Sequence, residues 1–525
     1  MNQSGVTQHG GLYVQFADQI DRERNGHLHA LHRVLMNDLL PGVNDLYPGY
    51  VNLYVDFDAR QVQVSEVRAW VTRHLEALRP ESVDGRLLEL PVRYDGPDLP
   101  DVAERTGLSE AEVVRLHSAT EYHVYAVGFT PGFPFLGDVT SELRLPRRST
   151  PRPLVPFNSV AVAGAQSCVY TLPSPGGWNL LGTLLTTVYD PNRAEPFLVS
   201  PGDRVRFVPQ TGQTPPLPEI RELWPAVPRF PALQVEVPGL LDLVQGDGRF
   251  QQAHVGLARS GPFDERSARF ANALVGNPPG TPLLELTLKG PVLTALRDVV
   301  VGVAGFGMVP VGYPVQRSFL LRTGETLRFR STPVGARAYL AVTGGLETLP
   351  VLGSSSTDLL GRVGRPLRAG DVLGLAELGK ARPGFASPLL TLPEETVLRL
   401  LPGPQATVEA LAALGSAPFR ITGNDRMGLR LGGPPVPGGQ TVSEGTPAGA
   451  VQVTPDGDPI VLLNDRGRIG GYSKPAVVHP HDLPLAAQLR PGQRVSFSPD
   501  LSGSPECWAR RWTVHAPTHF SGGRP

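Results

Sequence analysis

The stretch Tyr125-Ala126-Val127-Gly128-Phe129-Thr130-Pro131-Gly132-Phe133-Pro134-Phe135-Leu136-Gly137 carries the clearest local signal of the fold. Its three glycines, two prolines and three phenylalanines in 13 residues suit neither a regular strand nor a helix. A loop of this composition can bring backbone N–H groups close to a ligand while aromatic faces shield it. A packed structural turn is the alternative, and local composition alone favours it.

Turn residues are abundant throughout the chain. Of its 525 residues, 59 are glycine and 55 are proline, about twice the usual combined share. Hydrophobic residues still make up 41%, so the chain is not a disordered Pro/Gly-rich polymer. Short Val/Leu runs between turn residues predict many short strands and exclude a helical bundle. The length predicts roughly three to five domains.

Charge and cysteine usage narrow the choice of partners and compartment. Lys+Arg 48 against Asp+Glu 49 gives a net charge of -1, so no nucleic-acid partner is expected. Cys168 and Cys507 are too few for a disulfide framework or a zinc site, which suits a reducing cytoplasm. The N-terminus lacks the regions of a signal peptide. The apolar stretch 299–315 is broken by glycine and proline, which predicts buried strands and no membrane partner.

Changes of pattern along the chain predict six segments. The first residues alternate strand-like and helix-like periodicity and predict a small α+β domain, whereas the later sections are rich in short strands. The predicted boundaries are 1–88 for the α+β domain, 89–210 for a β-domain, 211–231 for a Pro-rich linker, 232–386 and 387–500 for two further β-domains, and 501–525 for a loose tail.

One repeat in the sequence indicates a duplication. Pro201-Gly202-Asp203-Arg204-Val205-Arg206-Phe207 recurs as Pro491-Gly492-Gln493-Arg494-Val495-Ser496-Phe497. Each copy is typical of a turn that leads into the last strand of a unit. Related β-domains are therefore expected.

Two loops pair adjacent glycines with an aromatic residue, Ser174-Pro175-Gly176-Gly177-Trp178-Asn179 and Gly470-Gly471-Tyr472-Ser473-Lys474. The second loop holds one of only three lysines in the chain and follows Asp465-Arg466. Lysine, arginine and carboxylate on neighbouring loops suit an anion or a polar amide. A solvated loop is equally consistent with this pattern.

Other polar clusters are weaker signals. Arg147, Arg148 and Arg152 could bind phosphate or carboxylate, although an exposed charged loop is the simpler interpretation. Asp425 and Arg426 could equally form a surface ion pair. The sequence holds neither a P-loop nor a G-x-S-x-G pattern. The histidine groups lack further ligands, so no metal site is predicted.

These motifs resemble a known family. Residues 11–209 are similar to the B-type component of bacterial 5-oxoprolinase, the KipI or allophanate-hydrolase-subunit-1 type. Residues 233–500 are similar to the C-type component, the KipA or allophanate-hydrolase-subunit-2 type. The matching text of the first part includes Leu90-Pro91-Val92-Arg93-Tyr94, Gly128-Phe129-Thr130-Pro131-Gly132-Phe133, Ala163-Gly164-Ala165-Gln166 and Ser174-Pro175-Gly176-Gly177-Trp178. In the second part it includes Gly353-Ser354-Ser355-Ser356-Thr357-Asp358, Asp425-Arg426-Met427-Gly428, Gly449-Ala450-Val451-Gln452-Val453 and Gly470-Gly471-Tyr472-Ser473-Lys474.

The resemblance implies a fold and an activity. The fold would be mainly β, with an N-terminal α+β domain and cyclophilin-like β-barrel domains in tandem, in a natural fusion of two components that are usually separate chains. The activity would be the ATP-dependent opening of the lactam 5-oxoproline to glutamate, with ATP and Mg as cofactors. A separate A-type protein of the 5-oxoprolinase system would be the partner, and a homo-oligomer is left open.

The resemblance also suggests site residues. Phosphorylating the lactam oxygen with ATP would need cations and backbone donors around developing charge. The expected catalytic residues are Asp465, Lys474 and Asp425. The expected substrate- or nucleotide-binding residues are Gly128, Phe129, Pro131, Gly132, Arg152, Gln166, Gly176, Gly177, Trp178, Arg426, Gln452, Gly470, Gly471 and Tyr472.

Departures from the family pattern keep other functions open. Asn158 stands where the B type usually has glycine, and residues 245–251 and 465–472 differ from the C-type motifs. One alternative is a carboxyltransferase-like module that acts on urea or a related amide, as in urea carboxylase. Another is a non-enzymatic regulator of a sensor kinase.

Overall fold

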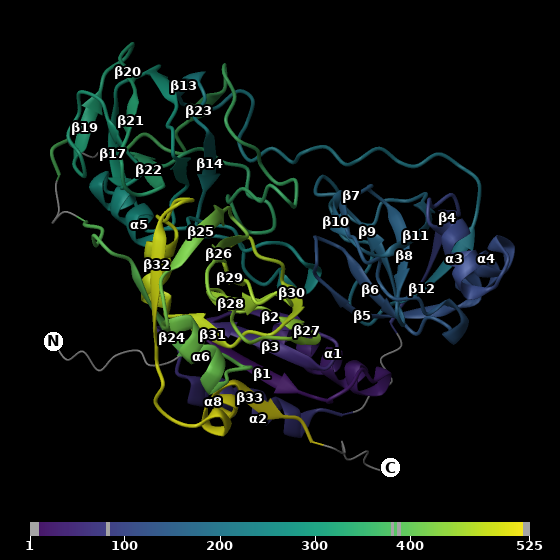
Figure 1. Cartoon of the computed structure of the whole chain (residues 1–525). Coiled ribbons are helices and arrows are strands. Elements are labelled where there is room, and N and C mark those ends of the chain that lie inside the picture. Colours follow the sequence, from purple (N-terminus) through teal and green to yellow (C-terminus); the bar gives the residue numbers. More distant parts are fainter. Residues whose placement is uncertain (1–9, 80–84, 380–382, 386–389, 518–525) are drawn as a thin grey trace.

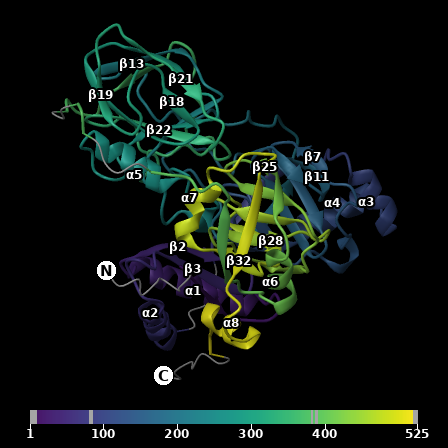
Figure 2. The ribbon, with the colours of Figure 1, turned by 60° about the vertical axis from the view of Figure 1, so that its left-hand side comes forward.

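A computed structural model describes residues 10–79, 85–379, 383–385 and 390–517. The chain is mainly β and contains two closed seven-stranded barrels, which confirms the expected fold class. An α+β unit lies against the second barrel, and a further β unit lies at the other side of that barrel (Figures 1 and 2). The expected domain end at 386 and the last residues of the expected tail, 518–525, lie outside the described residues.

The N-terminal unit is a four-stranded sheet with two helices. The strands are β1 (Gly11–Gln15), β2 (Val43–Pro48), β3 (Asn52–Phe57) and β33 (Thr513–His515), in the order β2-β3-β1-β33. The helices are α1 (Arg22–Asn37) and α2 (Val64–Ala77). Asp21 caps α1 by accepting a hydrogen bond from the Arg24 N–H, and Gln63 and Glu66 form a capping box on α2.

Strand alternation gives this sheet two different faces. Leu53 and Val55 of β3 point to the core shared with the helices. Asn52, Tyr54 and Asp56 alternate with them and therefore point to the opposite face. That second face packs on the second barrel, since Tyr54 shares a buried cluster with residues of that barrel.

Two barrels with the same topology follow. The first is ordered β11-β4-β12-β5-β6-β9-β8 and the second β31-β24-β32-β25-β26-β29-β28, closing on themselves. The strands of the first are β4 (Leu87–Arg93), β5 (Glu121–Val127), β6 (Pro134–Gly137), β8 (Ser159–Ala163), β9 (Gln166–Tyr170), β11 (Asn179–Leu184) and β12 (Arg204–Pro209). Those of the second are β24 (Val397–Pro402), β25 (Phe419–Asn424), β26 (Gly428–Gly432), β28 (Ala450–Val453), β29 (Pro459–Leu462), β31 (Ala476–Val478) and β32 (Arg494–Pro499).

The accessory elements of the barrels also correspond. Each barrel carries a two-stranded ribbon, β7 (Arg152–Val155) with β10 (Ser174–Gly176) and β27 (Gln440–Gly445) with β30 (Ile469–Tyr472). The two copies of the repeat lead into β12 and β32, and each of these strands pairs in parallel with the first strand of its barrel. The structure thus supports the duplication that the repeat predicts. The associated helices are α3 (Leu99–Thr106), α4 (Glu110–Ala119), α6 (Val408–Gly415), α7 (Leu483–Ala486) and the 3₁₀ turns Ser141–Leu143 and Pro480–Asp482.

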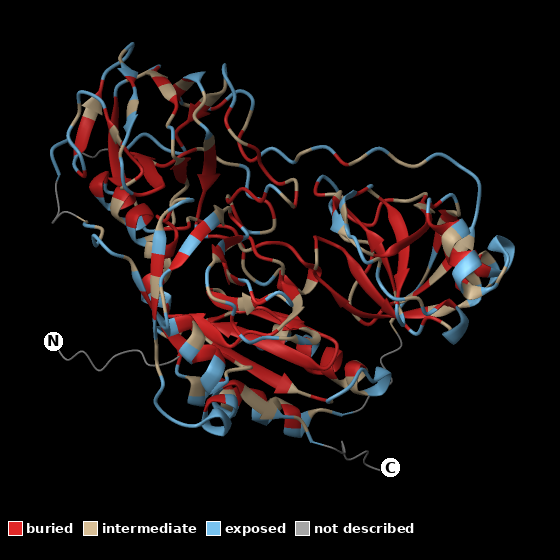
Figure 3. Cartoon of the chain, in the orientation of Figure 1, coloured by how far each residue is buried: buried red, intermediate tan, exposed pale blue. Residues whose placement is uncertain are grey.

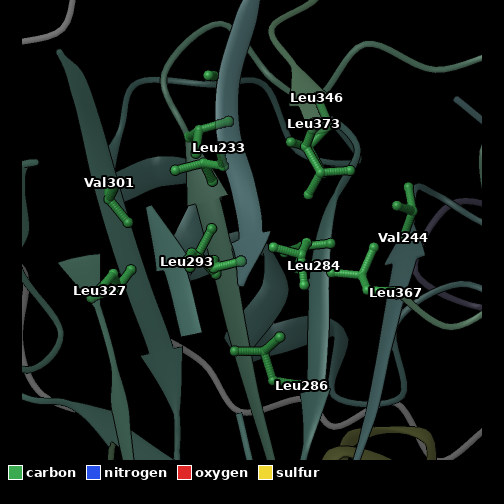
Figure 4. Packing of buried hydrophobic residues seen from close by; sticks show 14 of the residues in the cluster. Leu233, Val244, Leu284, Leu286, Leu293, Val301, Leu327, Leu346, Leu367 and Leu373 are labelled. Carbon is green, nitrogen blue, oxygen red and sulfur yellow. The ribbon is translucent and has the colours of Figure 1, made fainter. Parts of the chain in front are cut away.

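The β unit that comes between the two barrels in the sequence has two main sheets around one core, part of which is shown in Figure 4. One sheet is β20 (Thr326–Leu327), β16 (Val292–Ala295), β13 (Pro231–Val237) and β23 (Val372–Gly374). The other is β14 (Leu241–Gln245), β15 (Leu283–Thr287), β22 (Arg337–Val342), β17 (Val299–Gly305) and β19 (Ser318–Leu321). Helix α5 (Glu265–Leu274) covers the second sheet, β18 (Met308–Pro310) pairs with β21 (Phe329–Ser331), and a 3₁₀ turn spans Ala253–Val255. The uncharged stretch 299–315 contains β17 and β18, as its pattern predicts.

The segment from 210 to 220 joins the first barrel to this unit without any helix or strand (Figure 1). Its continuation is anchored, because Leu223 and Trp224 are buried in the core of the β unit. None of the described helices is long and apolar enough to span a bilayer.

The prediction of a loose tail is wrong for residues 505–515. Helix α8 (Pro505–Trp512) is capped by Ser504, and β33 adds to the sheet in parallel with β1. Trp508 and Trp512 are each only 1% exposed. The strands of the N-terminal sheet that β33 joins are mostly buried (Figure 3). Because the two indole rings bury a large apolar surface, they hold this segment in place although the preceding residues 501–504 are exposed.

Replacing Trp512 with alanine is expected to lower the free energy of unfolding by about 3–5 kcal/mol. Its ring packs on Tyr13, and its Nε1 donates a 2.9 Å hydrogen bond to the Pro402 carbonyl of the second barrel. Leu501→Ala, at a side chain that is 55% exposed, is the control and should change the value by less than about 0.5 kcal/mol. Urea denaturation measures both. Equal values for the two variants would contradict an anchored C-terminal segment.

Candidate functional site

The Gly128–Gly132 loop joins the two halves of the chain. It connects β5 to β6, and its Gly132 N–H donates a 2.8 Å hydrogen bond to the Val255 carbonyl. Gly128 packs closely on Ile469 of the second barrel, and Pro131 is buried while Phe129 is half-buried. The structure therefore supports the packed-turn interpretation of this loop.

The other expected binding residues of the first barrel cluster on its outer face. Arg152 and Arg148 form ion pairs with the buried carboxylate of Asp98, at 2.6 Å and 2.9 Å. Trp178 lies in an aromatic cluster, and the Arg147 guanidinium lies 5.7 Å from its ring centroid. Gln166 begins β9 on the same barrel, and Gly176 and Gly177 precede Trp178.

Lys474 is fully buried and bound to protein groups. Its Nζ lies 2.8 Å from Glu444 Oε1 and donates to the Tyr472 carbonyl. Glu444 also accepts hydrogen bonds from the side chains of Asn52, at 2.9 Å, and Gln405, at 2.8 Å. Because Asn52 belongs to the N-terminal sheet, this buried ion pair links that sheet to the second barrel.

The remaining expected residues of the second barrel divide into two groups. Asp465 and Arg426 form a buried ion pair at 2.6 Å, and Arg426 also bonds Glu285 of the neighbouring β unit. Burial raises the pKa of Asp465, although Arg426 acts in the opposite direction. Asp425 is partly exposed, accepts hydrogen bonds from the backbone of the β25–β26 turn and pairs with Arg430. Gly470 and Gly471 lie in β30, where Gly470 packs against the side chain of Gln452.

A cleft of about 530 Å³ lies elsewhere, between the N-terminal sheet, α5 and the second barrel. None of the expected site residues lines it. A smaller cavity of about 180 Å³ shares part of its wall. The polar residues that line the cleft are Asn44, Tyr54, Asp56, Asp58, Arg60, Arg259, Glu265, Arg266, Arg269, Asn464 and His481.

Two buried carboxylates lie at the wall of this cleft. Asp56, 7% exposed, lines it directly, and Asp45, 2% exposed, lies opposite Asp56 in the β2–β3 register. Burial raises the pKa of Asp45 to about 7, and the neighbouring Asp56 charge adds to that shift. Burial also raises the pKa of Asp56, which Arg259 partly offsets. Carboxyl groups in such surroundings are candidates for binding or proton transfer.

Arg259 lies close enough to Asp45 and Asp56 to act on both charges, and Arg60 lines the same cleft. Arg259 is 3.7 Å from Glu265, and its guanidinium lies 4.6 Å from the Phe250 ring centroid. Arg60 forms a 2.7 Å ion pair with Asp58. These contacts hold the guanidinium groups in place beside the cavity.

The residues of the cleft were missed because they come from three distant segments. A carboxylate in an otherwise apolar strand, as in Asn52–Phe57, is the one signal that could have found Asp56. The hydrophobic pattern alone identifies the strand but not what its polar side chains face.

The cleft does not fit a metal-bound nucleotide. Within the described ranges, no group of three His, Cys, Asp or Glu side chains is placed to hold a metal ion. The cleft lining has four arginines and three carboxylates, so its surplus positive charge is too small for Mg·ATP phosphates.

Known proteins match both halves of the chain. The family model for the carboxyltransferase domain, subdomain C and D, matches residues 5–199, and that for subdomain A and B matches residues 255–499. The B-type component of 5-oxoprolinase from Bacillus subtilis is 36% identical over 211 residues, 38% of this chain and 88% of that protein. The C-type component from Escherichia coli is 32% identical over 278 residues, 49% of this chain and 88% of that protein.

A solved structure resembles nearly the whole chain. The crystal structure of TTHA0988 is 54% identical, has a TM-score of 0.90 and covers 93% of this chain and 99% of its own. Other relatives are matched only in part. The chain covers 62% of the B-type component of 5-oxoprolinase from Escherichia coli O157:H7 and 16% of urea amidolyase from Saccharomyces cerevisiae.

Lys474→Met is expected to lower the free energy of unfolding by about 3–5 kcal/mol, because it leaves the Glu444 carboxylate buried without its cation. The double variant Lys474→Met/Glu444→Met should recover most of that loss. Urea denaturation of the two single variants and the double variant completes the cycle. Additive losses would show that the two side chains do not interact.

Asp45→Asn is expected to remove a pH dependence of stability. Because the folded pKa of Asp45 is about 7 and its ordinary value 3.8, the wild type should lose stability relative to the variant as pH rises from about 4 to 7. The change should be at most about 4 kcal/mol. Denaturation of both proteins across this range measures it, and parallel curves would contradict the buried, protonated carboxyl.

Proposed function

The chain belongs to the carboxyltransferase-domain family as a fusion of the B and C types of 5-oxoprolinase component, and on this premise we propose its function. It is proposed to be the fused B–C component of an ATP-dependent 5-oxoprolinase-type amidohydrolase. A separate A-type protein would complete the enzyme.

The composite cleft is the observation that supports this proposal best. Asn44, Asp56 and Arg60 come from the part that matches subdomains C and D. Arg259 and Asn464 come from the part that matches subdomains A and B. A site built from both halves would require the two types of component to act together, and a fusion would keep them in place.

The chemistry of lactam opening can be divided between two proteins, one that binds ATP and one that binds the amide. A lactam carbonyl is a poor electrophile, and ATP would convert its oxygen into a leaving group. Since the cleft has little surplus positive charge for Mg·ATP, we place the nucleotide with the A-type partner. This chain would bind and orient the small amide, so that water can open the activated ring. We propose Lys474 and Asp465 as positioning residues, because their buried ion pairs hold the units that form the cleft.

A second candidate is a carboxyltransferase-like module for urea or a related amide. The similarity to urea amidolyase, 30% identity over 308 residues, favours it. Urea carries the same N–H and C=O groups as a lactam, so the cleft alone does not separate the two substrates.

The test is a turnover assay on the purified chain, alone and with an A-type partner, supplied with ATP and either 5-oxoproline or urea. ADP and glutamate should appear only when 5-oxoproline, ATP and both proteins are present. Arg73→Gln, at an exposed ion pair of the N-terminal unit, is the control and should retain the rate. Absence of turnover together with tight binding to a histidine kinase would favour the regulator instead.

A further inference from the structure

The cleft of about 530 Å³ has two ends of different chemical character. The smaller cavity of about 180 Å³ marks one end, because residues that line both cavities lie where the two meet. All of these shared residues are polar, namely Asn44, Asp58, Arg60, Arg259, Glu265 and Arg269. The rest of the lining is mostly apolar and includes Tyr54, Ala448, Val477, Leu483 and Trp512. A ligand that fills the cleft therefore needs a polar group at one end and an apolar group at the other.

Helix α5 brings two accessible arginines to this cleft. Arg266 and Arg269 are neighbours on one face of the helix, and both are exposed and line the cleft. The contact of Arg269 with Glu265 is 3.6 Å, longer than a charge-assisted hydrogen bond of about 2.7–2.9 Å. Among the residues that the structure describes, Arg266 forms no ion pair. These guanidinium groups are therefore available to a carboxylate of a ligand.

The carboxylates near the two arginines have other surroundings. Asp264 lies close enough to Arg266 to interact with its charge, but it is buried, caps α5 and accepts a hydrogen bond from Gln488. Asp247 interacts with the charge of Arg269, and it lines the smaller cavity but not the cleft. With every group charged, the cleft lining has four arginines against three carboxylates. It therefore suits a ligand with one negative charge.

Asn464 supplies an oriented hydrogen-bond acceptor in the same cleft. Its Nδ2 donates 3.1 Å hydrogen bonds to the carbonyl oxygens of both Ser260 and Pro262. Two carbonyl acceptors on one side fix the orientation of the amide group, since only its nitrogen can donate to them. None of the described residues donates to Asn464 Oδ1, and Asn464 lines the cleft. Its Oδ1 can therefore accept a hydrogen bond from an N–H group of a ligand.

We propose that the cleft binds a 5-oxoprolyl dipeptide with an apolar second residue, its lactam N–H on Asn464 Oδ1 and its carboxylate between Arg266 and Arg269. The apolar side chain lies against Ala448 and Leu483. The inference rests on the proposed function for the lactam and extends the substrate class from free 5-oxoproline to its peptides. Cavities of roughly 300–1,000 Å³ hold drug-sized ligands, so free 5-oxoproline fills only part of this cleft.

Calorimetric titration of the full chain, without ATP or a partner, tests each contact through one change in the ligand. 5-Oxoprolyl-phenylalanine should bind about 10-fold or more tightly than 5-oxoproline, which lacks the apolar group. The C-terminal amide of the dipeptide lacks the carboxylate, and its N-methyl lactam lacks the N–H. Each should bind about 10-fold or more weakly than the dipeptide. Equal affinity for 5-oxoproline and the dipeptide would overturn the inference.

Variants assign the two polar contacts to residues. The double variant Arg266→Gln/Arg269→Gln should lose the preference for the dipeptide over its C-terminal amide. Asn464→Leu should lose the preference for the dipeptide over its N-methyl lactam. Arg73→Gln on α2, at an exposed ion pair, is the matched control and should keep both preferences. Wild-type preferences in the first two variants would contradict the assignment.

Ala448→Glu tests the apolar end. A charged side chain at this half-buried position should weaken binding of the dipeptide about 10-fold or more and leave that of 5-oxoproline within about 3-fold. Ala412→Glu, at an exposed position of α6, is the matched control and should bind both ligands as the wild type does. An unchanged affinity of Ala448→Glu for the dipeptide would overturn the placement of the apolar side chain.

The outcomes distinguish this inference from the proposed function. If a variant does not fold, the ligand series on the wild type decides, because it changes no residue. Turnover of 5-oxoproline with the A-type partner, without tighter binding of the dipeptide, would remove this inference and keep the function. Binding in the expected order, without turnover of either ligand, would keep the inferred site and remove the function.

Discussion

Strand β3 packs against the helices of its own unit on one face and against the second barrel on the other. The contact between these units depends on how its side chains alternate. Leu53 and Val55 pack under the helices of the N-terminal unit, whereas Asn52, Tyr54 and Asp56 face the second barrel. Asn52 reaches the buried Glu444, Tyr54 packs in the interface, and Asp56 reaches the cleft. A shift of one residue in register would exchange the two faces, so interface and cleft are specified together.

The two halves of the chain, each with its own barrel, are joined by buried polar contacts. The two barrels share one topology, but the polar clusters around them make different contacts. The Lys474–Glu444 and Arg426–Asp465 pairs are buried between units. Since removing one member of a buried pair is strongly destabilising, such pairs maintain a defined geometry between the units. The glycine-rich loop at Gly128–Gly132 does the same through close backbone packing on the C-type half.

The sequence predicts the architecture better than the site. Turn residues and apolar runs are local signals, so the mainly β fold and the duplicated turn before β12 and β32 are visible without coordinates. Strand β2 gives a weak sequence signal because a bulge between Val43 and Asp45 interrupts its alternation. The tail is misjudged because its buried tryptophans follow a polar segment. The cleft cannot be predicted from local sequence patterns, because its walls come from distant parts of the chain. Only the tertiary fold brings Asp56 and Arg259 to one cleft.

A crystal structure of the full chain with 5-oxoproline bound would test the central claim most directly, namely that both halves build one amide-binding cleft. The account predicts the ligand in the cleft between the N-terminal sheet, α5 and the second barrel, in contact with residues of both halves. A ligand bound instead against the outer face of the first barrel, near Arg152 and Trp178, would contradict the account.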